Sequence, residues 1–206
     1  MPEIVGRRPL RAATDPVLLT GPLPNPDLDA ATVAARAFLE ALGMDLGAPG
    51  LDRTPHRMAT AFAEMFRPRP FEMTTFANDE GYDEMVVAQD IPFTSVCEHH
   101  LLPFSGTATV GYLPGERILG LSKLARVVEL FAKRPQVQER MTQQIARFLE
   151  EHLVPRGVGV VLSAEHTCMT VRGVQAKGSR TTTSALLGRV REDARTRAEF
   201  LALSGR

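Results

Sequence analysis

Both cysteines of this 206-residue chain lie in two short clusters that also hold three of its five histidines. The first cluster is Cys97-Glu98-His99-His100, and the second is His166-Thr167-Cys168. Thiolate and imidazole are ligands that Zn²⁺ prefers, so the pattern indicates a metal site assembled from two distant segments. The feature constrains the fold strongly, because the chain has to bring these segments together in space.

Several alternatives to a catalytic metal site stay open at this point. A disulfide between Cys97 and Cys168 is unusual in a reducing compartment, and we expect a cytoplasmic protein because residues 1–20 lack the apolar core of a signal peptide. A lone cysteine is often only a small buried hydrophobe. A closed structural zinc site needs four ligands, which Cys97, His99 or His100, His166 and Cys168 could supply. Three ligands and an open position are typical of catalytic zinc, and we favour that interpretation.

Composition limits the range of partners. The 24 basic and 24 acidic residues cancel, which argues against a general nucleic-acid-binding protein. No apolar run is long enough to span a membrane. With 44% hydrophobic residues, the chain can bury one substantial core, so we expect one catalytic domain with an arm.

The first part of the chain divides into an arm and a helical region. Residues 1–26 are rich in proline and lack periodicity, which predicts a flexible arm. Residues 27–84 form the expected N-terminal helical region. Apolar spacing predicts a helix over residues 27–46, and Thr54 followed by Pro55 predicts a capped helix over residues 55–66.

Residues 85–206 are expected to form the catalytic region. Two strands, 85–96 and 104–113, are joined through the first cluster. Ser122 is predicted to cap one helix, and Pro135 to end it and begin a second. A strand over residues 157–171 would place His166 and Cys168 on one face, because side chains two apart share a face. A strand over 181–187 and a helix over 191–203 complete the order.

Several longer motifs occur in one order along the chain. They are Gly120-Leu121-Ser122-Lys123, Arg134-Pro135-Gln136-Val137-Gln138-Glu139-Arg140 and Arg172-Gly173-Val174, together with the two clusters. This set resembles the GTP cyclohydrolase I family over roughly residues 27–203. A single Cys-x-x-His would be weak support, whereas several long motifs in one order are specific.

The resemblance implies an α+β tunnelling fold, in which two helices are inserted between the strand pairs of an antiparallel β-sheet, preceded by N-terminal helices. It implies a toroidal homodecamer with active sites between subunits, and the conversion of GTP and water to formate and 7,8-dihydroneopterin triphosphate, the first step toward folate-type pterins. By the same resemblance the zinc ligands are Cys97, His100 and Cys168. Spacing alone leaves His99 and His100 equivalent.

The implied reaction suits these residue types. Opening the guanine imidazole ring requires water to attack the carbon between two nitrogens, and zinc makes that water ionise near neutral pH. The departing ring nitrogen needs a proton, for which imidazole is suited. His166 is the expected acid, in agreement with the family, and His99 is expected to help in proton transfer or orientation.

The resemblance also implies the substrate contacts. Glu139, beside Gln138, would accept the adjacent N–H donors of guanine, although a glutamate on a helix is more often only solvated. The triphosphate would be bound by four cationic side chains, Arg57, Lys123, Arg126 and Arg172, each of which alone would be an ordinary surface charge. Ser122, besides its expected capping role, would lie near the ribose.

The sequence lacks the motifs of several other classes of enzyme. The sequence has no G-x-x-x-x-G-K-[ST] loop of a GTPase, no P-C-x-x-C element of a zinc deaminase and no H-E-x-x-H of a metalloprotease. A non-catalytic, ring-forming protein of the same fold stays open as the second hypothesis.

Overall fold

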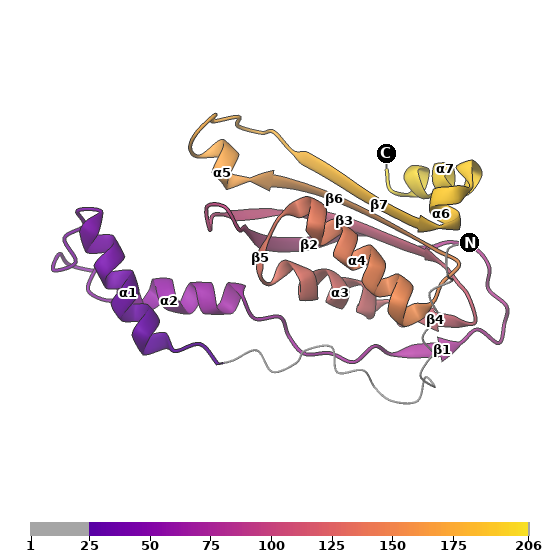
Figure 1. Cartoon of the computed structure of the whole chain (residues 1–206), viewed down its shortest axis with the longest axis horizontal. Helices are drawn as coiled ribbons and strands as arrows, with labels where there is room; N and C mark the ends of the chain where they lie inside the picture. Colours follow the sequence, from indigo (N-terminus) through magenta and orange to yellow (C-terminus); the bar gives the residue numbers. More distant parts are fainter. Residues whose placement is uncertain (1–24, 206) are drawn as a thin grey trace, which may run out of the picture.

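A five-stranded sheet lies at the centre of the structure (Figure 1). In sheet order its strands are β5 (Pro135–Gln136), β2 (Val86–Cys97), β3 (Pro103–Leu113), β6 (Gly157–His166) and β7 (Thr181–Gly188). Neighbouring strands are antiparallel except for β5, which runs parallel to β2. The computed structural model describes residues 25–205, so the expected arm lies almost wholly outside the described residues.

Two helices connect the two strand pairs. They are α3 (Ser122–Ala132) and α4 (Gln138–Leu153), which follow β3 and precede β6. Both cover the same face of the sheet (Figure 1), and their buried side chains join those of the strands in one core. The expected order of two strands, two helices and two strands is therefore confirmed, and the chain is of the α+β class.

The two faces of the sheet pack against different helices because side chains alternate along a strand. In β6, Val158, Val160 and Leu162 enter the core beneath α3 and α4. Val161 lies on the opposite face and packs with Phe200 of α7 (Ala194–Leu203) in a second, smaller cluster. The expected C-terminal helix over residues 191–203 is in fact two helices, α6 (Arg189–Glu192) and α7, because Asp193 adopts an extended conformation and caps α7.

Phe200 lies against two paired glycines, Gly111 of β3 and Gly159 of β6. A Cβ atom at Gly159 would lie 2.6 Å from the Phe200 ring. We expect Gly159→Ala to displace α7 and to destabilise the protein by about 1–3 kcal/mol, as overpacking does. Urea unfolding measures this. Gly120→Ala is the matched control, because its Cβ would meet no atom closer than 3.6 Å, and an equal loss in both variants would contradict the prediction.

The N-terminal helices are α1 (Leu28–Ala41) and α2 (Thr54–Met65), which pack on each other beyond one end of the sheet (Figure 1). The helix expected over residues 27–46 ends at Ala41, because the chain turns at Gly43 with a positive φ of 85°. Thr54 is not a cap: it is the first helical residue, after Arg53. No helix within residues 25–205 is both long and apolar enough to cross a membrane.

Two sequence predictions around α3 are wrong. Ser122 does not cap the helix, because the turn from Gly120 already provides backbone acceptors for the first N–H groups, those of Lys123 and Leu124. Pro135 does not begin the next helix. It pairs instead with Val96 in the short parallel strand β5, and α4 begins only at Gln138. Two short strands, β1 (Thr75–Ala77) and β4 (Arg117–Leu119), form a separate small sheet before α3.

Candidate metal centre and active site

Cys97, His100 and Cys168 meet at one end of the sheet. One potential ligand atom from each residue lies within 4.8 Å of those of the other two. The two sequence clusters therefore come together, as a shared metal site requires. His99 does not belong to this group, although its Nδ1 lies 3.8 Å from the Cys97 sulfur. The described residues thus favour His100 over His99 as a ligand.

The first cluster forms a tight turn between β2 and β3. Cys97 is the last residue of β2, and its N–H donates to the carbonyl of Leu102 at 2.8 Å. Its carbonyl accepts from the N–H of Leu101 at 2.8 Å, and Leu101 has a positive φ of 53°. This backbone geometry folds His100 back toward the Cys97 thiol.

The second cluster differs from its prediction. The strand expected over residues 157–171 ends at His166, and the next four residues form the single helical turn α5 (Thr167–Thr170). The Thr167 hydroxyl donates to the carbonyl of Pro103 at 2.6 Å, which fixes the bend against the start of β3. His166 and Cys168 therefore do not share a strand face. The helical turn, rather than strand alternation, directs Cys168 toward Cys97.

This donor set fits a zinc ion. In a tetrahedral zinc site, neighbouring sulfur and nitrogen ligands lie roughly 3.5–3.8 Å apart. The Cys97 sulfur lies 3.9 Å from Nδ1 of His100, close to that spacing. Both thiols are free, and burial together with the neighbouring Cys97 sulfur raises the pKa of Cys168. A cation between the sulfurs would favour both thiolates, so the pair is suited to a metal.

His166 lies beside this group in a restrained position. Its ring stacks on Phe104 at a centroid distance of 4.4 Å, and the two residues are cross-strand partners. Its Nε2 lies 2.7 Å from Oε1 of Gln138. Burial lowers the pKa of His166, and the negative charge of Glu139 opposes that shift. The imidazole is thus fixed in orientation beside a carboxylate that favours its protonated form.

Gln138 is buried, with 2% of its surface exposed. Its amide nitrogen donates to the carbonyl of Thr181 at 3.0 Å and to the hydroxyl of Thr183 at 3.1 Å. The amide oxygen therefore faces His166 and accepts a hydrogen bond from its Nε2. Gln138 is thus a partner of His166, and its predicted substrate contact stays a prediction. Glu139, in contrast, is exposed on the first turn of α4.

Arg172 contacts the metal group directly. Its Nη1 lies 3.2 Å from Nε2 of His100. A guanidinium only donates, so Nε2 is the acceptor and the imidazole proton is on Nδ1. A metal bound through Nδ1 requires the other tautomer, which cannot accept this hydrogen bond. Metal ligation would thereby free Arg172 for another anionic or acceptor group.

The remaining predicted contacts lie elsewhere in the chain. Ser122 and Lys123 begin α3 just after β4, whose Leu119 N–H donates to the Tyr112 hydroxyl. Tyr112 pairs with Val86 at the opposite end of β2 from Cys97. A strand of that length spans roughly 36 Å. A single chain therefore does not bring the start of α3 to the metal group, as Figure 1 also shows.

The other two predicted triphosphate contacts are Arg126 on α3 and Arg57 on α2. Arg126 is paired with Glu129 at 3.2 Å, and Arg69 binds the same carboxylate. Those contacts lower the pKa of Glu129, with the hydrogen bond from Arg69 as the largest cause. Arg57 is exposed on α2. Sequence reasoning missed Phe104 and Thr183, which support His166 and Gln138, because only the strand register reveals these partners.

Three residues that could hold a metal lie at the end of an α+β sheet, close to a histidine held by ring stacking and a hydrogen bond, as expected of a metal-dependent enzyme. The family model of GTP cyclohydrolase I matches residues 31–205. The chain is 54% identical over 170 residues to GTP cyclohydrolase 1 of Aquifex aeolicus, covering 82% of this chain and 92% of that protein. It is 52% identical over 175 residues to GTP cyclohydrolase 1 of Thermobifida fusca, covering 82% and 84%. The chain belongs to the GTP cyclohydrolase I family.

Proposed function

We propose that this protein is a zinc-dependent GTP cyclohydrolase. It opens the imidazole ring of the guanine of GTP hydrolytically, releases formate and forms 7,8-dihydroneopterin triphosphate. The observation that carries the proposal is the meeting of Cys97, His100 and Cys168 beside His166, in a chain of this family. Two thiols and one imidazole leave one position of a tetrahedral metal open, as a catalytic site requires.

The chain's own residues provide the proton transfers. Bound zinc would supply Lewis acidity and an activated water near neutral pH. His166 donates a proton to the ring nitrogen that leaves the attacked carbon, since imidazole exchanges protons in this pH range. Phe104 and Gln138 hold its ring in place, and Glu139 favours its charged form. His99, exposed within the ligand turn, is the second proton-transfer or orienting group.

The first turn of α4 binds the guanine base in this proposal. The carboxylate of Glu139 accepts the adjacent N–H donors of the base, and an ionised carboxylate suits this because it only accepts. Glu139 is exposed and lies near enough to His166 to affect its pKa. The base would therefore bind beside the group that protonates it.

Completion of the site requires a second copy of the chain. Ser122 and Lys123 lie at the far end of the sheet from the metal group, so a neighbouring subunit has to provide the contacts to the ribose and the triphosphate. Arg57, Arg126 and Arg172 complete the cationic set. We propose a toroidal homodecamer with interfacial sites, built from residues 85–206 as the tunnelling-fold catalytic region and residues 27–84 as the helical region. It would work in the cytoplasm, where thiolates stay reduced.

The test is incubation of the purified protein with GTP, with formate and the fluorescence of the oxidised pterin measured together. We expect both products in equal amounts. Chelation should abolish them and added Zn²⁺ should restore them, because the three ligands hold the metal reversibly. Full turnover after chelation, or release of phosphate in place of formate, would contradict the proposal and favour another GTP chemistry or a scaffolding role.

A further inference from the structure

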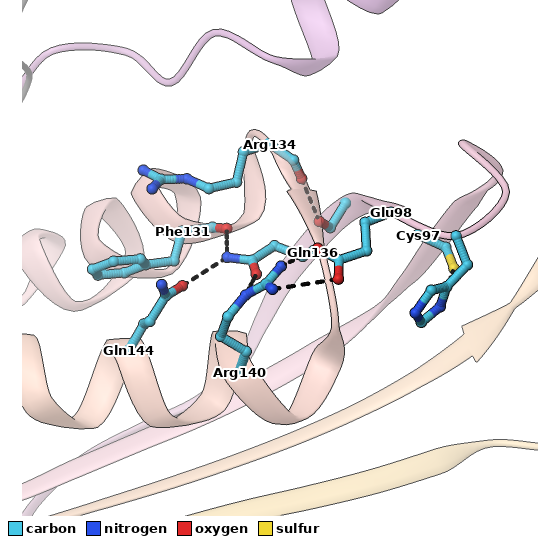
Figure 2. A network of polar contacts seen from close by, with 9 residues as sticks. Cys97, Glu98, Phe131, Arg134, Gln136, Arg140 and Gln144 are labelled. Carbon is cyan, nitrogen blue, oxygen red and sulfur yellow. Dashed lines mark hydrogen bonds and ion pairs between the residues drawn. The ribbon is translucent and has the colours of Figure 1, made fainter.

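An ion pair and a buried amide tie the metal-ligand turn to helix α4 (Figure 2). Glu98 stands between the ligand Cys97 and His99, and its carboxylate binds both terminal nitrogens of Arg140 from α4. The Nε of Arg140 donates to Oε1 of Gln136 at 3.1 Å. One guanidinium thus contacts both the ligand turn and β5.

Gln136 anchors this arrangement. It is 1% exposed, and its amide nitrogen donates to the Phe131 carbonyl at 2.9 Å and to Gln144 at 2.8 Å. Its backbone pairs with Cys97, and its carbonyl accepts the N–H of Glu98 at 3.1 Å. The turn is therefore attached to β5 through the backbone and to α4 through the side chains.

Arg140 lies in the first turn of α4, next to residues assigned to the active site. Arg140 directly follows Gln138 and Glu139, which face His166 and its surroundings. The same helical turn therefore carries the partner of His166, the base-binding carboxylate and the cation that holds the ligand turn. The Glu98 and Arg140 side chains remain 33% and 45% exposed, so the pair contributes little to folding stability.

We propose that Glu98, Arg140 and Gln136 form a positioning clamp. The clamp fixes the turn of Cys97 and His100 against the first turn of α4, and so keeps the metal-binding side and the base-binding side of the site in register. The proposed mechanism gives none of the three a contact with substrate, so they are positioning residues and not catalytic ones. This inference rests on the proposed function of the site, and it assigns a role to residues that the reaction chemistry does not use.

The test is a double-mutant cycle on the full-length protein, with Glu98→Gln, Arg140→Gln and the double variant. Zn²⁺ affinity is measured by competition with a chromophoric chelator, and kcat and KM for GTP by product formation. We expect each single variant to lower Zn²⁺ affinity and kcat by about 10-fold or more, as loss of groups that orient metal ligands does. KM should change by less than about threefold, because the base and phosphate contacts remain.

The double variant should be no worse than Arg140→Gln alone, because Arg140→Gln already removes the contact with Glu98 as well as that with Gln136. Arg140→Lys should not restore function, since an ammonium cannot bind both Glu98 oxygens and Gln136 together. Arg147→Gln, an exposed charge removal on the same helix, is the matched control and should behave as the parent.

Three results would contradict the clamp. They are additive losses of Zn²⁺ affinity and kcat in the double variant, recovery of both in Arg140→Lys, and single variants with the same Zn²⁺ affinity and kcat as Arg147→Gln. Glu98→Gln is nearly isosteric at a half-exposed position, so it keeps the test decisive if an Arg140 variant folds poorly. The zinc measurement separates this inference from the proposed function. A parent protein that forms no formate refutes the function, while the zinc affinities still decide the clamp.

Discussion

Replacement of His166 by alanine is expected to lower kcat for formate release by about 10²–10⁴-fold, the range for loss of a general acid or base. Zinc content should stay unchanged, because His166 is outside the three-ligand group. The loss has a definite physical cause. In the proposed mechanism the imidazole stacked on Phe104 protonates the ring nitrogen, and alanine has no proton to donate.

Two further variants separate chemistry from packing. His166→Asn keeps a polar N–H group at this position, but a carboxamide cannot act as an acid near neutral pH, so it should lose as much activity as His166→Ala. His152→Ala removes another ring-stacked histidine, on Phe148, and should retain parental kcat. Substantial turnover in His166→Asn would show that the reaction does not need His166 as an acid.

Replacement of Cys168 by serine is expected to lower Zn²⁺ affinity by more than about 100-fold and to abolish turnover at stoichiometric metal. Changes to groups that merely orient ligands already cost about 10–100-fold, so loss of a ligand should cost more. A serine hydroxyl has neither the softness nor the acidity of a thiol at neutral pH. Metal analysis after gel filtration, with chelator competition, measures the effect.

Chelated parent protein provides the internal control for this variant. Zinc readdition should restore formate release in the parent, whereas Cys168→Ser should recover activity only at a large excess of metal, if at all. Parental zinc content in Cys168→Ser would exclude Cys168 as a ligand. Parental activity without zinc would exclude the metal from the reaction altogether.

Much of the fold follows from patterns that are local in the sequence. The alternation in the β3 segment and the apolar stripe of α4 predict the strands and helices that form the core. Element ends were less predictable, because they depend on neighbours. Serine is a residue type typical of helix caps, yet at Ser122 backbone carbonyls of the preceding turn accept the first hydrogen bonds of the helix instead of its side chain. Asp193, which no local pattern singled out, caps α7 instead.

The site was predictable in its chemistry but not in its geometry. The residue types around Cys97 and Cys168 indicate a metal, whereas the helical turn that aims Cys168 depends on a contact between Thr167 and Pro103 from another strand. β-branched residues near Thr167 favour a strand locally, and tertiary contacts override that preference. The separation of Ser122 from Cys97 likewise becomes visible only when the sheet is assembled.

The most direct test of the central claim follows the attacked carbon. The protein would be incubated with Zn²⁺ and GTP labelled with ¹³C at the carbon between the two imidazole nitrogens, and the products observed by NMR. We predict that the label appears in free formate, in equal amounts with the pterin product, and that His166→Asn forms neither. Label retained in an intact guanine, with phosphate as the product released, would contradict the account.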